Sequence, residues 1–228
     1  MVPQNEIMQI RIKFKKYGSL MYISHLDLAR TMQRIIVRAG IDIWYTEGFN
    51  PQPKIVFAVP LPVGVESECE YMDIKLNSFM DCEEIRQRLN ANFPDEMEVI
   101  DVYVPEQKLK NITYIDYELL ISSKAIDDNS PEQIEKLFSN DIFVTKRSKG
   151  TEKQVNVKEY INSLKATLIG KDLQIRAVIC SGSDKNLNPE LLIEAIKTNT
   201  RILNGSPLEE LYSIKRKEML DLSLNIFR

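Results

Sequence analysis

Alternating apolar and polar positions mark the first predicted strand. Met8, Ile10, Ile12 and Phe14 occupy every second position of segment 8–15, and Gln, Arg or Lys residues fill the positions between them. Because successive side chains of a strand point to opposite faces, this pattern predicts a strand with one buried face and one wet, basic face.

A helix is predicted to follow in the segment SHLDLARTMQRIIVRAG, residues 24–40. Ser24 is a favourable N-cap, and Asp27 falls in the first turn, where a carboxylate stabilises the helix dipole. Gly40 fits the C-terminal stop. The apolar positions recur at helical spacing and predict one buried stripe, made of Leu28, Met32, Ile35, Ile36 and Ala39.

The pattern of the first half continues with short elements. Two brief extended segments precede a firmer strand, a second helix and a closing strand, at residues 41–45, 54–59, 70–76, 81–92 and 98–104. If the two brief segments form one broken strand, the order is βαββαβ. This order predicts a ferredoxin-like α+β sandwich.

The second half repeats this order less regularly. Strands are predicted at residues 114–122, 142–146, 153–157 and 172–180. Helices are predicted from the capping box Ser130-Pro131-Glu132-Gln133, at the weakly patterned 158–165, and at 188–197. Residues 208–216 fit a strand or a helix. The prediction is an α+β protein of two tandem ferredoxin-like halves, the second irregular, with domains at 1–106 and 112–228.

Composition narrows the class of protein. The 228 residues are 43% apolar, which is enough for a packed core. Apolar runs stay well short of the ~18 residues of a transmembrane helix, and the N-terminus lacks the apolar centre of a signal peptide. Cys69, Cys82 and Cys180 are widely spaced and predict neither a disulfide framework nor a metal site. We therefore expect a cytoplasmic protein that does not enter a membrane.

Charge is distributed unevenly along the chain. Residues 1–58 hold eight Lys or Arg and four acids, a net charge of +4. The whole chain carries −3, so the remainder carries −7. A basic segment on an acidic body is typical of proteins with an anionic partner, although ordinary surface charge also explains a difference of this size.

Known catalytic motifs are missing from the sequence. It contains no Walker-type phosphate loop, no GxGxxG, and no CxxxCxxC spacing for a radical S-adenosylmethionine cluster. The single histidine, His25, precedes Leu26 at the start of the first predicted helix. It could act in acid-base catalysis, contact a phosphate at the helix N-terminus, or satisfy a local hydrogen bond. We favour the last of these, and no other residue is a catalytic candidate.

Two basic segments could contact an anion. Arg30, Arg34 and Arg38 follow one another at a spacing of four on the first helix, and Asp27 precedes Arg30 by three. The positive charge of three arginines exceeds the negative charge of one carboxylate, and arginine suits phosphate or carboxylate recognition. A solvated helix face is an equal alternative. Residues 145–153 (TKRSKGTEK) predict a basic hairpin tip with Lys149-Gly150 at its turn, which we interpret mainly as a solvated loop.

A proline-rich stretch is the most unusual part of the sequence. Residues 45–67 (YTEGFNPQPKIVFAVPLPVGVES) contain four prolines among many apolar residues. Because proline fixes φ and biases its predecessor toward extended conformations, Asn50-Pro51-Gln52-Pro53 predicts a stiff corner whose neighbours fill the core. Its alternative role is a binding site, in which aromatic and cationic groups stack a base or hold a phosphate. The candidates are Tyr45, Gly48, Phe49, Pro51, Pro53 and Lys54.

Residues 8–76 resemble the radical-SAM-linked protein family. The matching motifs are SHLDLAR, RAG, GFNPQPK, PLPVGVES and EYMDI, with Gln52 where the family pattern has histidine. Members are bacterial domains encoded beside, or fused to, a cobalamin-type radical S-adenosylmethionine protein. The resemblance implies a partner that holds an iron–sulfur cluster, S-adenosylmethionine and, where it is of the cobalamin type, cobalamin, and it implies no cofactor in this chain. It also adds weight to the motif residues Ser24, His25, Asp27, Arg30, Gly48, Phe49, Pro51, Pro53 and Lys54.

Three functions are compatible with these observations. The first is a non-catalytic accessory module that binds tRNA or rRNA for the radical enzyme. The second is an adaptor that docks this enzyme through the proline corner. The third is an RNA-processing enzyme, because CRISPR repeat-cutting endoribonucleases and one class of pseudouridine synthase have tandem ferredoxin-like halves. The acidic remainder of the chain counts against RNA binding, but we expect the first function.

Overall fold

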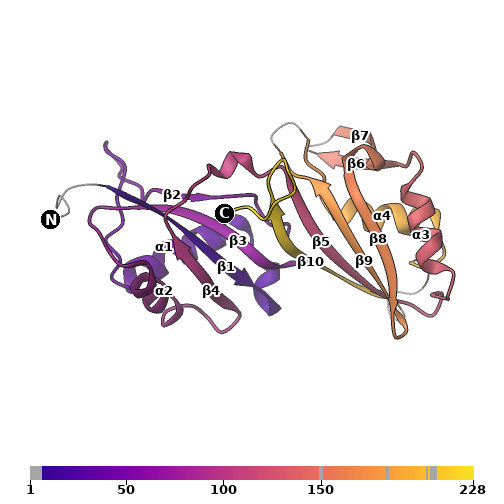
Figure 1. Cartoon of the computed structure of the whole chain (residues 1–228), viewed down its shortest axis with the longest axis horizontal. Coiled ribbons are helices and arrows are strands. Elements are labelled where there is room, and N and C mark those ends of the chain that lie inside the picture. The colour runs from indigo at the N-terminus through magenta and orange to yellow at the C-terminus, as the bar shows by residue number, and fades with distance from the viewer. Residues whose placement is uncertain (1–6, 149–150, 183–184, 204, 206–209) are drawn as a thin grey trace. The chain divides into compact units, whose positions relative to one another are not determined.

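The fold is taken from a computed structural model that describes residues 7–148, 151–182, 185–203, 205 and 210–228. The α+β class is confirmed, since the described residues form four α-helices and mainly antiparallel strands (Figure 1). The chain divides into two compact units. The N-terminal unit comprises residues 1–109 with Arg228, and the C-terminal unit comprises residues 110–227.

The N-terminal unit places two helices on one face of an antiparallel sheet. Its elements follow in the order β1 (Met8–Lys16), α1 (His25–Arg38), β2 (Ile55–Phe57), β3 (Val65–Leu76), α2 (Cys82–Asn90) and β4 (Met97–Tyr103). Strand β1 pairs with β3 and β4, and β2 pairs with β3, so the strands lie in the order β4-β1-β3-β2. A 3₁₀ turn, η1 (Gly18–Tyr22), replaces the predicted link between β1 and α1.

The core of this unit lies between the sheet and the helices. Ile10, Ile12 and Phe14 on β1 are buried against the apolar stripe of α1, as the alternation predicts. All five predicted stripe residues of α1 are buried, and Gly40 ends the helix with a φ of 66°. A fully buried Leu or Ile side chain contributes roughly 1.5–3 kcal/mol, so this stripe fixes the helix on the sheet.

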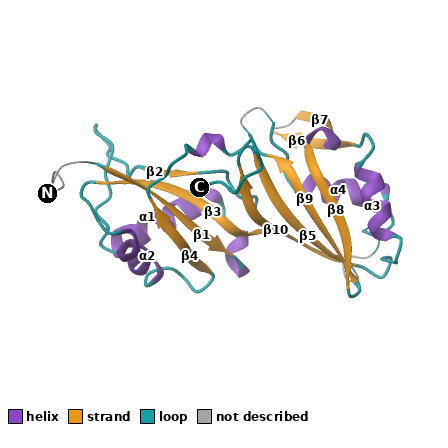
Figure 2. Cartoon of the chain, in the orientation of Figure 1, coloured by secondary structure: helices purple, strands orange, loops and turns teal. Residues whose placement is uncertain are grey.

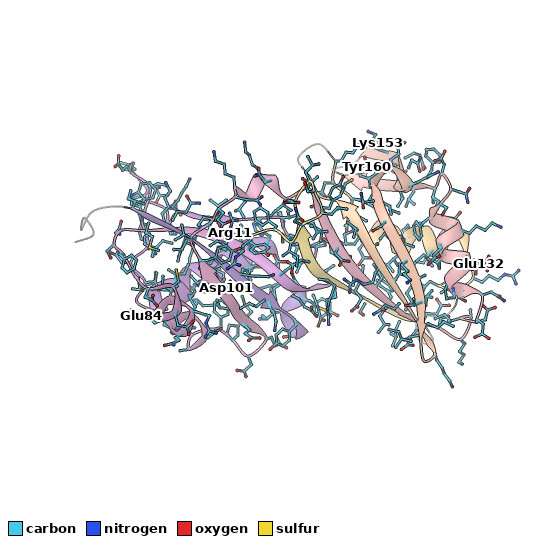
Figure 3. All side chains as sticks on the ribbon, viewed as in Figure 1. Arg11, Glu84, Asp101, Glu132, Lys153 and Tyr160 are labelled. Atoms are coloured by element: carbon cyan, nitrogen blue, oxygen red, sulfur yellow. The ribbon has the colours of Figure 1, made fainter. Side chains whose placement is uncertain are left out.

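The other face of β1 differs from the prediction. Arg11 was expected on a wet surface, but its side chain is fully buried. Its Nε and Nη2 donate to the two carboxylate oxygens of Asp73 on β3 at 2.7 and 2.9 Å, and Nη2 also donates to the Gln107 carbonyl at 2.8 Å. Figure 3 shows Arg11 within the sheet of this unit. Alternation gives the face of a residue but not what covers that face, which is why the prediction was wrong.

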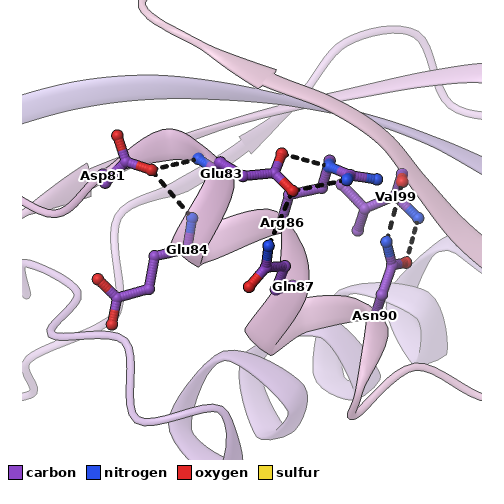
Figure 4. A network of polar contacts seen from close by, with 7 residues as sticks. All are labelled: Asp81, Glu83, Glu84, Arg86, Gln87, Asn90 and Val99. Atoms are coloured by element: carbon purple, nitrogen blue, oxygen red, sulfur yellow. Dashed lines mark hydrogen bonds and ion pairs between the residues drawn. The ribbon is translucent and has the colours of Figure 1, made fainter.

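Helix α2 is tied firmly to the strand that follows it (Figure 4). Asp81 caps the helix by accepting from the backbone N–H of Glu83 at 3.0 Å. Asn90 accepts from the Val99 N–H at 2.8 Å and donates to the Val99 carbonyl at 3.1 Å. On the surface, hydrogen bonds from Arg86 hold the pKa of Glu83 down to about 2. The Asn90 pair braces the intervening loop, which forms part of the site described below.

The C-terminal unit has the same succession of main elements with a hairpin inserted. Its elements are β5 (Tyr114–Ser122), α3 (Ser130–Phe138), β6 (Phe143–Ser148), β7 (Thr151–Asn156), η3 (Val157–Tyr160), β8 (Ile161–Ile169), β9 (Asp172–Cys180), α4 (Glu190–Asn199) and β10 (Leu211–Leu220). The main strands lie in the order β10-β5-β9-β8, while β6 and β7 form a separate hairpin (Figure 2).

Two sequence predictions for this unit were wrong. The helix predicted at 158–165 is mostly strand β8, because Leu164, Ala166 and Leu168 alternate with exposed residues rather than repeating at helical spacing. The capping box at Ser130 does not form, since the Ser130 hydroxyl donates back to Asp127 at 2.9 Å. The ambiguous segment 208–216 is strand from Leu211, and residues 206–209 lie outside the described residues.

Candidate nucleic-acid interface

The N-terminus of α1 forms the local structure that its sequence predicts. Ser24 Oγ accepts a hydrogen bond from the backbone N–H of Asp27 at 3.1 Å and donates to the Asp27 carboxylate at 2.7 Å. The Ser24 hydroxyl is therefore paired with the Asp27 carboxylate. It also accepts from a helix N–H that would otherwise lack a partner. Their contacts give them a structural role in starting α1 and orienting the residues that follow.

Replacing Ser24 with alanine is expected to lower the free energy of unfolding by about 1 kcal/mol, because the helix loses its N-cap acceptor. Urea unfolding followed by circular dichroism measures this change. Ser24→Thr is the control and should retain most of the stability, since threonine also caps helices. An alanine variant as stable as the parent would contradict the capping role.

His25, the only catalytic candidate, lies at the first position of α1. Its exposed ring meets Phe57 of β2 edge-on, with the ring centroids 5.2 Å apart and an interplanar angle of 81°. Within the described residues no hydrogen bond orients the imidazole toward a nucleophile or a carboxylate. The ring contact instead joins the start of α1 to the strand that follows the proline corner.

The three arginines of α1 lie on its solvent face, opposite the buried stripe. Nη1 of Arg30 lies 3.6 Å from Oδ1 of Asp27, and both side chains are about 60% exposed, so this ion pair contributes little to stability. Arg34 is exposed in the next turn. Arg38 is also exposed, but its Nε donates to the Asn92 side-chain oxygen at 3.0 Å and its Nη2 donates to the Asn92 carbonyl.

The proline corner is a hydrogen-bonded loop that we call the 44–54 hairpin. The Trp44 carbonyl accepts from the Lys54 N–H at 2.9 Å, and the Thr46 N–H donates to the Gln52 carbonyl at 2.8 Å. At the base, the Trp44 N–H donates to the Lys75 carbonyl of β3 at 2.7 Å. Figure 2 shows this segment as a loop that leads into β2. The corner predicted from its prolines is therefore held to the sheet at its base.

The tip of the 44–54 hairpin faces solvent, which partly corrects the sequence interpretation. Leu61 is buried and Ile55 and Phe57 are partly buried against the core, as predicted. Phe49, however, is as exposed as in an extended peptide, at 108%, and Tyr45 is 42% exposed. Gly48, Pro51 and Lys54 are exposed beside them, Pro53 is half-buried, and Gly48 adopts a φ of 131°. A braced loop thus presents aromatic rings and a cation to solvent.

A groove beside α1 brings two of the predicted arginines together with residues that the sequence did not indicate. It has a volume of about 280 Å³. Helix α1 contributes Thr31, Arg34, Ile35 and Arg38, and the loop between α2 and β4 contributes segment 92–94. Asn92, Phe93 and Pro94 carry no motif, and they lie more than fifty positions from α1 in sequence. Only the packing of α2 beside α1 brings them to this site.

The second basic segment, residues 145–153, lies on the β6-β7 hairpin. The pairing of Phe143 with Asn156 and of Ser148 with Thr151 confirms the predicted hairpin. Its Lys149-Gly150 turn and the side chains at 146–148 lie outside the described residues.

The described residues show neither a metal-ligand cluster nor a membrane-spanning helix. In the described ranges, no three His, Cys, Asp or Glu side chains gather closely enough to hold a metal ion. None of the helices described has the length and apolar character needed to cross a bilayer.

Comparison with known proteins gives a family match. The sequence model of a family described as "Uncharacterized protein conserved in bacteria (DUF2344)" matches residues 9–189. The search of curated proteins returns no match.

The solved structures are only distantly similar. A chain of a Cbf5-Nop10-Gar1 complex has 10% identity and a TM-score of 0.49, and a chain of an H/ACA RNP bound to a substrate RNA containing 2'-deoxyuridine has 11% and 0.47. Both matches cover 92% of this chain, which spans about half of their length, at 48% and 47%. An unknown protein from Galdieria sulphuraria has 6% identity and a TM-score of 0.27, with coverage of 92% and 99%.

Proposed function

We propose that this chain, which belongs to the family described as Uncharacterized protein conserved in bacteria (DUF2344), is a non-catalytic accessory module that binds RNA. The surface proposed to bind is the solvent face of α1 together with the 44–54 hairpin. The observation that carries this proposal is Phe49, a fully exposed ring on a braced loop. Stacking of a base on such a ring contributes about 1–3 kcal/mol and tolerates any base sequence.

The local charge of α1, rather than the net charge of the unit, supports an anionic ligand. Arg30, Arg34 and Arg38 are exposed, and the one carboxylate close to them in the helix, Asp27, is shared with the Ser24 cap. Arginine presents a planar set of donors that matches phosphate oxygens. Stacking on the hairpin and phosphate contacts along α1 together match the way single-stranded RNA is bound.

The RNA would be tRNA or rRNA, presented to a radical S-adenosylmethionine enzyme. This part of the proposal rests on the family resemblance of residues 8–76. The partner would hold the iron–sulfur cluster, S-adenosylmethionine and, where it is of the cobalamin type, cobalamin. This chain would supply substrate binding alone. We place the complex in the cytoplasm, where an iron–sulfur enzyme and its RNA substrate meet.

We also propose that the two units are tandem ferredoxin-like halves. The support is their common order of elements, βαββαβ, with the β6-β7 hairpin as an insertion in the second. Their sheets agree as well, since the strands lie as fourth, first, third and second in each unit.

A mobility-shift titration with tRNA at two salt concentrations tests RNA binding. For single strands, log K falls with log[salt] with a slope of about −0.7 for each phosphate contact. The triple variant Arg30→Ala, Arg34→Ala, Arg38→Ala loses every phosphate contact that these arginines make, so it should reduce the magnitude of this slope by about 0.7 or more. A matched triple variant of exposed lysines in the C-terminal unit, at Lys136, Lys165 and Lys171, should leave it unchanged.

Two outcomes would contradict RNA binding by this surface. One is parent protein that shows no salt-sensitive shift. The other is an arginine variant that binds as the lysine variant does. If the radical enzyme instead co-purifies with the parent and is lost from the Phe49→Ala variant, the hairpin is a protein-docking element.

A further inference from the structure

We infer that the groove between α1 and segment 92–94 is a binding site for a single phosphate group, and that it holds a backbone phosphate of the RNA. The second half of this inference rests on the proposed function. The first half rests on the groove alone, an open depression of about 280 Å³ whose lining includes two arginines, one threonine and apolar residues.

Arg38 is fixed in orientation before any ligand arrives. Its Nε and one Nη2 hydrogen are taken by the side chain and carbonyl of Asn92. Asn92 is itself held, because its Nδ2 donates to the Arg88 carbonyl at 2.8 Å. A guanidinium has five N–H donors, so about three remain for a ligand. A donor group that is already oriented loses less entropy on binding, which favours affinity.

Arg34 completes the cationic side of the groove. It precedes Arg38 by four positions, and within the described residues neither guanidinium is paired with a carboxylate. Two like charges at this spacing destabilise a helix by about 0.2–0.5 kcal/mol, and an anion placed between them removes this repulsion. Thr31, one turn before Ile35, adds a hydroxyl that can donate to a phosphate oxygen.

The charges around the groove favour an anion on balance. The C-terminal end of α1 carries a partial negative charge of about one half, which opposes an anion. The exposed carboxylate of Asp95, next to Pro94, also opposes an anion, and the two full positive charges of Arg34 and Arg38 exceed both together. Arg88 donates to the Gly40 carbonyl at 3.3 Å but is also paired with Glu84, so it adds little net charge.

The size and rigidity of the groove limit the ligand. Drug-sized ligands occupy pockets of about 300–1,000 Å³, so 280 Å³ suits a phosphate with part of its sugar rather than a large cofactor. Ile35, Phe93 and Pro94 give the apolar floor against which a ribose would pack. The loop that carries Phe93 and Pro94 is braced by the paired hydrogen bonds of Asn90 and Val99.

The experiment uses NMR of the full chain, observing the arginine Nε–Hε signals. The probes are inorganic phosphate, uridine 5'-monophosphate, uridine without phosphate, and a single-stranded hexauridylate. We expect every probe with a phosphate to shift the Arg34 and Arg38 signals. Inorganic phosphate and uridine 5'-monophosphate should leave the Arg30 signal unchanged, and uridine should shift none of the three. Arg34→Ala with Arg38→Ala should weaken hexauridylate binding about tenfold or more and reduce its salt slope by about 0.7. Lys165→Ala with Lys171→Ala, exposed in the C-terminal unit and outside the proposed RNA surface, is the matched control.

Asn92→Ala separates orientation from charge. It leaves both guanidiniums in place, so it should weaken phosphate binding several-fold with the salt slope unchanged. Arg34 and Arg38 signals that move only with hexauridylate would show that the groove recognises the polymer rather than a phosphate, which would overturn the inference.

The outcomes distinguish this site from the proposed function. Hexauridylate binding that is equally strong in the double arginine variant and in the double lysine variant would overturn the phosphate site and leave RNA binding standing. Phosphate shifts at Arg34 and Arg38 without hexauridylate binding would support the site and overturn the proposed function. Absence of both effects would contradict both.

Discussion

Replacing Asp73 with alanine is expected to lower the free energy of unfolding of the N-terminal unit by about 3–5 kcal/mol, the range for breaking a buried ion pair. Arg11 is fully buried, and two of its donors lie 2.7 and 2.9 Å from the Asp73 carboxylate. Removing the carboxylate leaves a buried charge without its counter-ion. Domains have a total stability of about 5–15 kcal/mol, so this is a large part of it.

Urea unfolding followed by the fluorescence of Trp44, the only tryptophan, measures this loss in the unit concerned. Glu98→Ala is the matched control, because it removes a carboxylate from an exposed pair with Lys15 at 3.0 Å and should cost at most about 1 kcal/mol. Replacing both members of the buried pair, as in Arg11→Met with Asp73→Leu, should recover much of the stability. A loss for Asp73→Ala no larger than that of the control would contradict the account.

Replacing Phe49 with alanine is expected to weaken binding of single-stranded RNA about 5- to 150-fold, equivalent to the 1–3 kcal/mol of one stacked base. The ring is fully exposed, so its removal should leave the stability of the protein unchanged. Stacking releases no counter-ions, and the salt slope should therefore stay the same. This result differs from that of the arginine variants, which change the slope.

A fluorescence anisotropy titration with labelled hexauridylate at several salt concentrations measures both quantities. Phe79→Ala is the matched control, because Phe79 is 68% exposed on the same unit but lies outside the 44–54 hairpin. Phe49→Trp should bind at least as well as the parent, since a larger ring stacks better. If Phe49→Ala bound RNA as Phe79→Ala does, base stacking on the hairpin would be excluded.

Local patterns in the sequence predicted the elements that position the site. The α1 stripe, its Ser24 cap and the Gly40 stop could be read directly, because a helix fixes which neighbours share a face. The alternation of Ile10, Ile12 and Phe14 likewise gave the buried face of β1. In each case, residues within one or two turns, or within one strand, determine the structure.

Prediction failed where distant residues decide the environment. The burial of Arg11 depends on Asp73, sixty-two positions away, and the groove depends on Asn92 reaching Arg38 across fifty-four. Strand β3 begins at Val65 rather than at residue 70, because its first residues follow prolines that suggested a loop. The positions of the prolines also do not indicate which aromatic residues of the corner are buried. Phe57 packs in part against the core, whereas Phe49 faces solvent.

The central claim is that RNA lies on the α1 face and the 44–54 hairpin, and photocrosslinking tests it most directly. The full chain would be irradiated with RNA containing 4-thiouridine, digested with trypsin, and analysed by mass spectrometry. Cleavage after Arg38 and Lys54 releases residues 39–54 as one peptide that holds the whole hairpin. The account predicts that this peptide carries the main crosslink, at Phe49 or Tyr45, and that Phe49→Ala reduces it. Crosslinks confined to residues 110–227, with none in peptide 39–54, would contradict it.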